Sequence, residues 1–338
     1  MNITRNELCI RQWAESNASS LGLQQGIEIK VTYIYNPGGF VNQSYRISDG
    51  KTMRHLKLAP DARMHRLQQW AAVSEQLSNR YHAPRLIREI REEIIPGYRY
   101  GLVFEYIHGE SLTSTSNPAE AIPKVLIKLH QLHGDQELAS ALVRSDEPFT
   151  YADAFADAYI ARFLEDMVTI RDGKHLLHFV TEETLDWFDA EIEALRATVY
   201  AHPAFNKAAN DVVHNDPGWN NVLVDELHEI WVIDWDDLSA DGDAAMDYSV
   251  LLWPLYHSAD WPYLQAQVIE QAGDELYARL SIYFRASLLD DVIDILADYV
   301  DSESIPELRE KTQARAQAIH LRAYPEYLRL YARANQGE

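Results

Sequence analysis

The chain reads Val212-Val-His-Asn-Asp-Pro-Gly-Trp-Asn-Asn-Val-Leu-Val224 and, after five further residues, Ile230-Trp-Val-Ile-Asp-Trp-Asp236. This segment contains His-x-Asp-x-x-x-x-Asn, formed by His214, Asp216 and Asn221, and then Asp234 at the end of an apolar run. A Pro-Gly turn follows Asp216, and the two apolar runs are short enough to form an antiparallel hairpin. Such a hairpin brings Asn221 and Asp234 to the same end, where their oxygen atoms can bind one cation.

These residue types suit the transfer of a phosphoryl group. That reaction requires a carboxylate near the acceptor hydroxyl and hard oxygen ligands for magnesium. Asp216 matches the first requirement, and Asn221 and Asp234 match the second. The alternative interpretation is a surface loop with scattered, solvated acids. The apolar strands that flank each polar group favour the first interpretation.

The same residues resemble the aminoglycoside phosphotransferase and choline kinase superfamily, which has a protein-kinase-like fold. Its pattern is His-Gly-Asp-x-x-x-x-Asn followed by Ile-Asp-Trp or Ile-Asp-Phe, and here Asn215 replaces the glycine. Asparagine also enters the left-handed backbone region readily, so this departure is tolerable. Gly242-Asp243 and Asp247-Tyr248-Ser249 resemble the family's Gly-Asp-Pro-x-x-Asp-Leu-Ala. The resemblance implies Asp216 as the catalytic aspartate, Asn221 and Asp234 as ligands of Mg²⁺, His214 as structural support, and Asp247 as a brace behind the catalytic loop.

A glycine-containing loop precedes the second expected strand. Asn36-Pro-Gly-Gly-Phe-Val-Asn-Gln-Ser-Tyr-Arg-Ile47 resembles the nucleotide-binding loop of the family. The resemblance implies that Gly38, Gly39 and Asn42 belong to the nucleotide site, since glycines let backbone amides approach phosphates. By itself a Gly-Gly loop is more typical of a simple hairpin turn, but its position before a lysine-bearing strand favours the nucleotide loop.

Lys57 lies between apolar neighbours in His55-Leu-Lys-Leu58. An ammonium group that points inward needs a compensating anion, whereas a lysine on the solvent face does not. The resemblance implies that Lys57 contacts the nucleotide phosphates and pairs with a carboxylate of the next helix. Glu75 is the only glutamate there, so it is the expected partner. If Gln68 or Gln69 takes that position instead, the ion pair is missing.

A further segment, Gly101-Leu-Val-Phe-Glu-Tyr-Ile-His-Gly-Glu-Ser-Leu112, resembles the stretch that joins the two lobes in the family. The resemblance implies that backbone groups of Glu105 and Ile107 bind the adenine edge. A plain edge strand that ends at Gly109 is the alternative, because recognition through the backbone leaves no side-chain pattern.

The halves of the chain differ in their periodicity. Strands are expected at 27–34, 41–47, 53–58, 86–90 and 100–107, with one helix at 62–78. Helices are expected at 119–133, 151–167, 182–199 and, three or four in number, from 245 to the C-terminus. The sequence therefore predicts an α+β, two-lobed fold. Residues 1–107 form a nucleotide-binding lobe with a five-stranded antiparallel sheet, and residues 108–338 form a mainly helical lobe with the catalytic loop and acceptor region. A hinge near residue 107 would leave a cleft between them.

Composition narrows the partners. The 338 residues include 52 acidic and 30 basic side chains and carry a formal charge of −22, which disfavours a nucleic acid partner. The one cysteine, Cys9, excludes an intramolecular disulfide and agrees with a reducing compartment. The sequence contains no stretch of about 18 apolar residues, which a membrane span would need. The N-terminus has no secretion-signal pattern. We expect a cytoplasmic protein.

The acceptor is the least determined part of the prediction. Asp290, Asp294, Asp298 and Asp301 recur at helical spacing, and aromatic residues crowd the segment after Asp247. They suit a cationic acceptor, yet an amphipathic surface helix and ordinary core aromatics explain them as well. We expect a kinase that uses ATP or GTP with Mg²⁺ and a small hydroxylated acceptor, such as an aminoglycoside-type antibiotic or amino alcohol. The alternatives are a metabolic choline, homoserine or sugar kinase, and a nucleotide-binding pseudoenzyme with a regulatory role. The sequence leaves the oligomeric state open.

Overall fold

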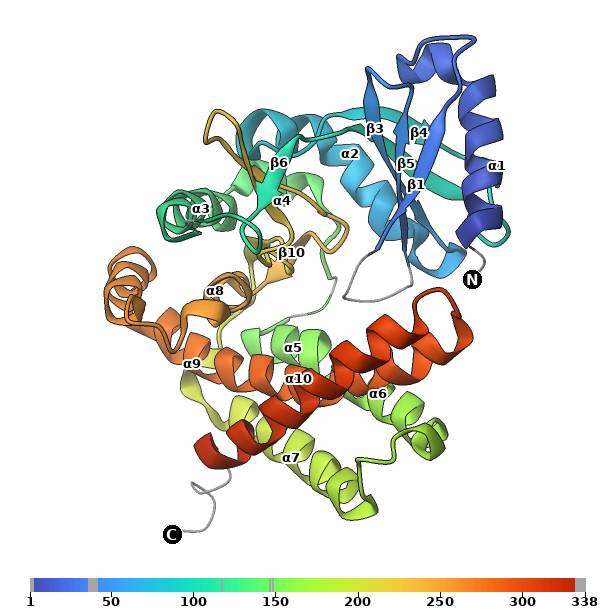
Figure 1. Ribbon diagram of the computed structural model, residues 1–338. Coiled ribbons are helices and arrows are strands. Elements are labelled where there is room, and N and C mark those ends of the chain that lie inside the picture. The colour runs from blue at the N-terminus through green and yellow to red at the C-terminus, as the bar shows by residue number, and fades with distance from the viewer. Residues whose placement is uncertain (1–2, 36–41, 117, 146, 148, 332–338) are drawn as a thin grey trace. The chain divides into compact units, whose positions relative to one another are not determined.

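The computed structural model describes residues 3–35, 42–116, 118–145, 147 and 149–331 (Figure 1). The chain forms two compact units, one of residues 1–143 with 214–240 and the other of residues 144–213 with 241–338. The first unit holds more than the expected sheet lobe, because residues 108–143 and the hairpin at 214–240 pack with the sheet. A functional hinge near residue 107 stays a prediction.

A five-stranded antiparallel sheet in the order β1-β2-β3-β5-β4 forms the centre of the first unit. Its strands are β1 (Lys30–Ile34), β2 (Gln43–Ser48), β3 (Met53–Ala59), β4 (Leu86–Ile90) and β5 (Tyr100–Glu105). The helix α2 (Met64–Tyr81) comes between β3 and β4 in the chain. The predicted sheet and its order of elements are therefore confirmed, with boundaries that differ by a few residues.

Helices cover both faces of this sheet. The helix α1 (Ile3–Ser16), which the sequence did not lead us to expect, lies along β1 in Figure 1 and packs Ile10 and Ala14 into a core with Leu56 and Val103. Successive strand side chains point to opposite faces of a sheet. Lys57 follows Leu56 and Phe104 follows Val103, so both side chains lie on the face away from α1. There the ring of Phe104 stacks on Trp70 of α2.

Two tight turns of the first unit have a glycine at positive φ. Gly50, after Asp49, has a φ of 91°, and Gly97, after Pro96, has a φ of 83°. A side chain is strained at such positive φ values. The backbone amide of Thr52 donates to the carboxylate of Asp49 and closes the first turn. The backbone amide of Tyr98 donates to the carbonyl of Ile95 and closes the second. Glycine therefore suits both turns.

The rest of the first unit contains a second sheet and two helices. The sheet order is β6-β8-β9, formed by β6 (Gly109–Ser111), β8 (Val222–Asp225) and β9 (Ile230–Val232). The helices are α3 (Pro118–His133) and α4 (Gln136–Ala141). The side chain of Asp135 caps α4 by accepting from the amides of Glu137 and Leu138.

The second unit is mainly helical. Its longer helices are α6 (Ala161–Asp172), α7 (Glu182–Ala201), α8 (Ala244–Leu252), α9 (Trp261–Asp301) and α10 (Arg309–Leu330), preceded by the short α5 (Tyr151–Phe155). Gly273 interrupts α9 with a φ of 84°. The helix α10 packs along α9 (Figure 1). Two short strands, β7 (Asp211–Val213) and β10 (Ser239–Gly242), stand where the chain passes between units.

A buried ion pair and an aromatic cluster stabilise the interior of the second unit. Arg279 donates two hydrogen bonds to Asp243, at 2.8 and 3.0 Å. The half-buried rings of Trp253 and Trp261 contact Tyr256, and Tyr256 and Trp261 contact the buried ring of Phe284. Within the described ranges, the model contains no helix with the length and apolarity that crossing a bilayer requires.

Candidate active site

The hairpin of β8 and β9 brings the predicted metal ligands together. Val222 pairs with Val232 in antiparallel register, and the amide of Ile233 donates to the carbonyl oxygen of Asn221 at 2.9 Å. Asn221 therefore lies opposite Ile233, and Ile233 is the residue that precedes Asp234. The predicted hairpin is confirmed, and it places Asn221 and Asp234 at the same end because the strands are of matched length.

Asp216 lies next to Asn221 on the loop before this hairpin. The side-chain nitrogen Nδ2 of Asn221 donates to the carboxylate of Asp216 at 2.8 Å and to the backbone carbonyl of Asp216 at 3.0 Å. The side chain of Asp216 is exposed, as a group that receives an acceptor hydroxyl must be. Since Nδ2 of Asn221 is used in these bonds, the side-chain oxygen Oδ1 is the atom that can bind a cation.

His214 and Asn215 fix the loop that carries Asp216. His214 is fully buried, and its ring packs on Trp235 with the centroids 4.5 Å apart. The amide of Asp216 donates to Nδ1 of His214 at 3.2 Å, so Nε2 carries the proton and donates to the carbonyl of Ile233 at 3.0 Å. Asn215 has the left-handed φ of 69° that its place in the motif required. These contacts agree with the supporting role predicted for His214, which itself stays a prediction.

Lys57 points inward to two carboxylates of the hairpin segment. Its ammonium group forms ion pairs with Asp234 and, at 2.8 Å, with Asp236. Burial lowers the pKa of Lys57, but the two carboxylates more than offset this and raise the pKa above its usual value. The inward orientation of Lys57 was one of the two alternatives for this strand, and the structure selects it.

The two carboxylates differ in their environment. Burial and the charge of Asp236 raise the pKa of Asp234, although Lys57 acts in the opposite direction. Burial also acts to raise the pKa of Asp236, but Lys57 and hydrogen bonds, including one with Asp234, hold it below its usual value. Asp234 has a φ of 69°, a left-handed conformation that aspartate tolerates better than most residues. The ion pair with Lys57 therefore favours the charged form of Asp236.

The structure does not place Glu75 at Lys57. Glu75 lies on the exposed face of α2, and the residue of this helix next to the ammonium group is Trp70, whose ring centroid lies 5.9 Å from Nζ. Gln69 is turned to another segment, since its amide donates to the carbonyl of Leu238 at 2.6 Å. The expectation that Glu75 pairs with Lys57 is corrected: the rotation of α2 presents an indole to the site instead of a carboxylate.

The predicted nucleotide loop is described in part. Gly38 and Gly39 lie outside the described residues. Asn42, which immediately precedes β2, donates from its amide nitrogen to Asp236 at 2.6 Å. Asn42 is therefore part of the same cluster as Lys57 and Asp236, and its role toward phosphates stays a prediction.

Glu105 and Ile107 lie at and just beyond the end of β5. The amide of Glu105 donates to the carbonyl of Arg85 at 3.0 Å, and its carboxylate accepts from the amide of Arg85 at 2.9 Å. Glu105 also pairs with Arg54 of β3 in the sheet. Both residues are half-buried, and their contact with adenine stays a prediction.

Asp247 belongs to the second unit. It is fully buried in the first turn of α8. Its predicted contact with the catalytic loop stays a prediction.

The donor atoms of the hairpin fit magnesium. Asn221 and Asp234 offer hard oxygen atoms, which Mg²⁺ prefers, and Mg²⁺ commonly binds through one or two protein ligands together with phosphates and water. No group of three or more His, Cys, Asp or Glu side chains suited to a metal occurs among the residues that the model describes. The fit is therefore to a cation held jointly by protein and nucleotide, as opposed to an all-protein cage.

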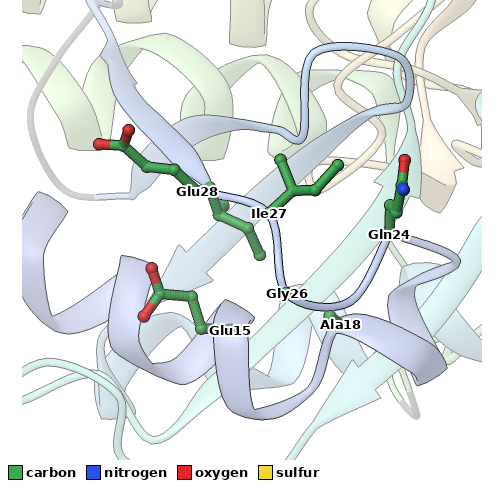
Figure 2. Close-up of a pocket in the computed structure, with 7 residues that line it drawn as sticks. Glu15, Ala18, Gln24, Gly26, Ile27 and Glu28 are labelled. Carbon is green, nitrogen blue, oxygen red and sulfur yellow. The ribbon is translucent and has the colours of Figure 1, made fainter.

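An open cavity of about 380 Å³ lies elsewhere on the first unit (Figure 2). Its lining comes from the end of α1 and the segment that leads to β1. None of its residues belongs to the cluster around Lys57: they are Glu15, Ala18, Gln24, Gly26, Ile27, Glu28 and Ile29. The cavity is an open surface depression apart from the proposed chemistry.

A family model described as the phosphotransferase enzyme family matches residues 32–283. This match spans more than half of the sequence and includes Lys57, Asp216, Asn221 and Asp234. The chain therefore belongs to the phosphotransferase enzyme family, and it is a small-molecule kinase with an α+β, kinase-like fold. No curated protein matches the chain in sequence.

Solved structures share this fold over most of the chain. The GDP and kanamycin complex of APH(2″)-IIIa is 12% identical, with 93% of this chain and 99% of that chain covered and a TM-score of 0.60. An ethanolamine kinase of Plasmodium vivax is 12% identical, with 88% and 82% covered and a TM-score of 0.57. Spectinomycin phosphotransferase APH(9)-Ia, in complex with ADP and spectinomycin, is 14% identical, with 94% and 93% covered and a TM-score of 0.54. At these identities the likeness shows the fold alone.

Two residues of the cluster, Asp236 and Trp70, were not expected from the sequence. The signal for Asp236 was present, because it stands two positions after Asp234 and closes the same apolar run. Nothing in the sequence of α2 singled out Trp70 over other core residues.

Proposed function

We propose that this protein transfers the γ-phosphate of ATP or GTP, with Mg²⁺, to a hydroxyl of an aminoglycoside-type antibiotic or related amino alcohol. One observation carries the proposal: Lys57 forms an ion pair with Asp234, Asn221 donates to Asp216, and the hairpin bond from Ile233 to Asn221 brings these two pairs to the same end of β8 and β9. A buried cation and three oxygen-bearing side chains in one place are what a metal-bound triphosphate requires.

The side chains divide the work of phosphoryl transfer. Lys57 binds the phosphates. Its place on β3 fixes the position of the ammonium group. Asp216 orients the acceptor hydroxyl and accepts its proton. Asn221 and Asp234 hold magnesium, which when bound neutralises charge on the transferred phosphate. His214 keeps the catalytic loop in the conformation that presents Asp216.

The nucleotide is ATP or GTP. In this proposal the base lies at Glu105 and Ile107, whose backbone groups bind its edge. Structures of the same fold were solved with GDP and with ADP, so the fold accepts either base. Backbone recognition at this chain's β5 is compatible with both.

Carboxylates of α6 and α9 in the second unit support a cationic acceptor. Arg162 of α6 pairs with Asp290 of α9, but more acids surround it than one guanidinium neutralises. Burial, together with the charge of Asp294, raises the pKa of Asp166 to about 7 and that of Asp298 to about 8. Of the α9 acids, Asp290, Asp294 and Asp298 are half-buried and Asp301 is exposed. The raised pKa values reflect burial and repulsion between carboxylates, and a cationic amino group placed beside them would favour their charged form.

A second candidate is a metabolic small-molecule kinase. The fold that this chain shares with an ethanolamine kinase keeps amino alcohols such as choline among the acceptors, besides homoserine and sugars. A pseudoenzyme is less well supported, because the residues proposed for catalysis and metal binding are all present. We place the reaction in the cytoplasm, in agreement with the absence of disulfide chemistry in a chain with one cysteine.

The test is a coupled ADP-production or GDP-production assay with a panel of aminoglycosides, spectinomycin, macrolides, choline, ethanolamine and homoserine. Calorimetric titration with magnesium nucleotide comes first. We expect nucleotide binding that depends on magnesium, and turnover with one class of hydroxylated amine. Binding without turnover on any acceptor would favour the pseudoenzyme, and no nucleotide binding at all would exclude the proposal.

A further inference from the structure

The surroundings of Lys57 differ from the helix ion pair that the resemblance implied. The helix α2 contributes the face of Trp70, at 5.9 Å from the ammonium group, while Glu75 is exposed to solvent. The charges that compensate Lys57 come instead from the segment after β9. The lysine is therefore anchored to the hairpin that carries the metal ligands.

We propose that Asp236 is a positioning residue that holds the Lys57 ammonium group for the nucleotide phosphates, in the place expected for a carboxylate of α2. The inference rests on the proposed function, because it concerns the same nucleotide site. In this proposal Asp236 acts by holding Lys57 and Asn42 in place, and it does not touch the reacting atoms.

Both oxygen atoms of the Asp236 carboxylate are used. One lies 2.8 Å from Nζ of Lys57, and the other accepts from the amide nitrogen of Asn42 at 2.6 Å. Asp236 thereby connects β3, the residue before β2 and the hairpin segment. The exposed fractions of the side chains of Lys57 and Asp236 are 4% and 11%, so little water competes for these bonds. Interactions in such an environment hold their geometry better than exposed ion pairs do.

Asp234 does not serve the same purpose. It pairs with Lys57 in this structure, but it is also the proposed ligand of magnesium. A carboxylate whose charge is shared with a divalent cation attracts an ammonium group less. Asp236 is then the partner that Lys57 retains when the site is loaded, and Trp70 closes the side from which α2 would have offered a carboxylate.

The first test compares three acid-to-amide variants: Asp236→Asn, Glu75→Gln and Asp237→Asn. Asp237 is the matched control, because it is adjacent in sequence, undergoes the same chemical change and pairs with Arg66 at the surface. The probe is magnesium ADP in calorimetric titration, followed by KM and kcat for the nucleotide. We expect Asp236→Asn to weaken nucleotide affinity about 10- to 100-fold, the range found for displaced supporting groups. Glu75→Gln and Asp237→Asn should match the wild type.

A purely structural role for Asp236 would reduce the fraction of folded enzyme, which lowers kcat and leaves KM for the nucleotide unchanged. A positioning role raises KM and the dissociation constant, and Asp236→Glu should restore part of the affinity. Asp236→Asn with wild-type affinity, or a loss that appears in Glu75→Gln instead, overturns the inference. If wild-type protein binds no magnesium nucleotide, it is the proposed function that fails.

A double-mutant cycle adds a second readout. Lys57→Met removes the group through which Asp236 is proposed to act, so Asp236→Asn should cost little further affinity in that background. Additive losses would show that Asp236 acts independently of Lys57. Circular dichroism and unfolding temperature identify any variant that fails to fold, and the remaining comparison of Asp236→Glu with wild type still decides the question.

Discussion

At the scale of single residues, Asp216 combines exposure with a fixed orientation. Its carboxylate is open to solvent, while Asn221 donates to it at 2.8 Å and His214 accepts from its amide at 3.2 Å. A general base needs this combination, since it must reach a hydroxyl without losing its position.

We predict that Asp216→Asn lowers kcat by about 10²- to 10⁴-fold, the usual contribution of a positioned base. The dissociation constant of the magnesium nucleotide should stay within a factor of two or so of wild type, because the asparagine keeps the shape of the loop. Glu226→Gln, in the exposed turn of the same hairpin, is the matched control. Unchanged turnover in the Asp216 variant would remove the role assigned to this carboxylate.

Asp234 supports a different expectation. Asp234→Ala removes one of the two proposed metal ligands and one partner of Lys57. We expect nucleotide affinity to become nearly independent of magnesium concentration, whereas wild-type affinity rises with it. Calorimetric titrations at several magnesium concentrations measure this directly. A variant whose affinity still increases with magnesium as in the wild type would contradict the assignment.

At the scale of elements, close contact between β3 and β5 fixes the strand that carries Lys57. Gly101 of β5 pairs with Leu58 of β3, and a Cβ atom at Gly101 would lie 2.5 Å from a methyl group of Leu58 and 2.9 Å from the carbonyl oxygen of Lys57. Glycine is required there because the backbone of the neighbouring strand leaves no room.

We predict that Gly101→Ala destabilises the protein by about 1–3 kcal/mol, the range for overpacking in a core. It should also weaken nucleotide affinity, since β3 has to shift at Lys57. Gly134→Ala is the control, because nothing lies within 4 Å of the added Cβ and its φ is not in the strained range. Chemical denaturation measures both variants, and equal stabilities would show that β3 and β5 yield without cost.

Sequence patterns predicted elements well and their rotation poorly. The five strands, α2 and the hairpin followed from alternation, turn residues and apolar runs. The helix α1 was missed, because its apolar residues are few and interrupted by charge. Glu75 was chosen as the only glutamate on α2, but which face of a helix meets a given lysine depends on how the helix packs on the sheet. Trp70 and Phe104 decide that packing.

At the scale of the whole molecule, the charge of −22 is concentrated in part on α9. Asp290 pairs with Arg162 of α6, whereas the charged groups that act on Asp298 are Asp294 and Asp301 of α9, Asp166 of α6 and Arg315 of α10. Burial raises the pKa of Asp298 to about 8, so the folded protein holds a proton that the unfolded chain releases near the usual carboxyl pKa. Folding stability attributable to this group is therefore present at low pH and is lost as pH rises toward 8.

We predict that Asp298→Asn raises the unfolding temperature at pH 8 and raises it less at pH 5, where the folded wild type already carries the proton. Differential scanning calorimetry across this range provides the measurement. Glu307→Gln, an exposed acid beyond α9, should show no such pH-dependent gain. A gain for Asp298→Asn that is equal at both pH values would place the aspartate in a fully solvated environment.

The sequence by itself determined the α+β class, the order of elements along the sheet lobe and the hairpin, because local periodicity and turn residues encode these directly. Motif spacing also singled out Asp216, Asn221, Asp234 and Lys57 as the predicted site. The tertiary structure decided which partner each charge has. It paired Lys57 with Asp236 and left Glu75 in solvent, since helix rotation and strand packing are set by the shared core. Contacts between residues about 180 positions apart, as between Lys57 and Asp236, follow from that core and from no local pattern.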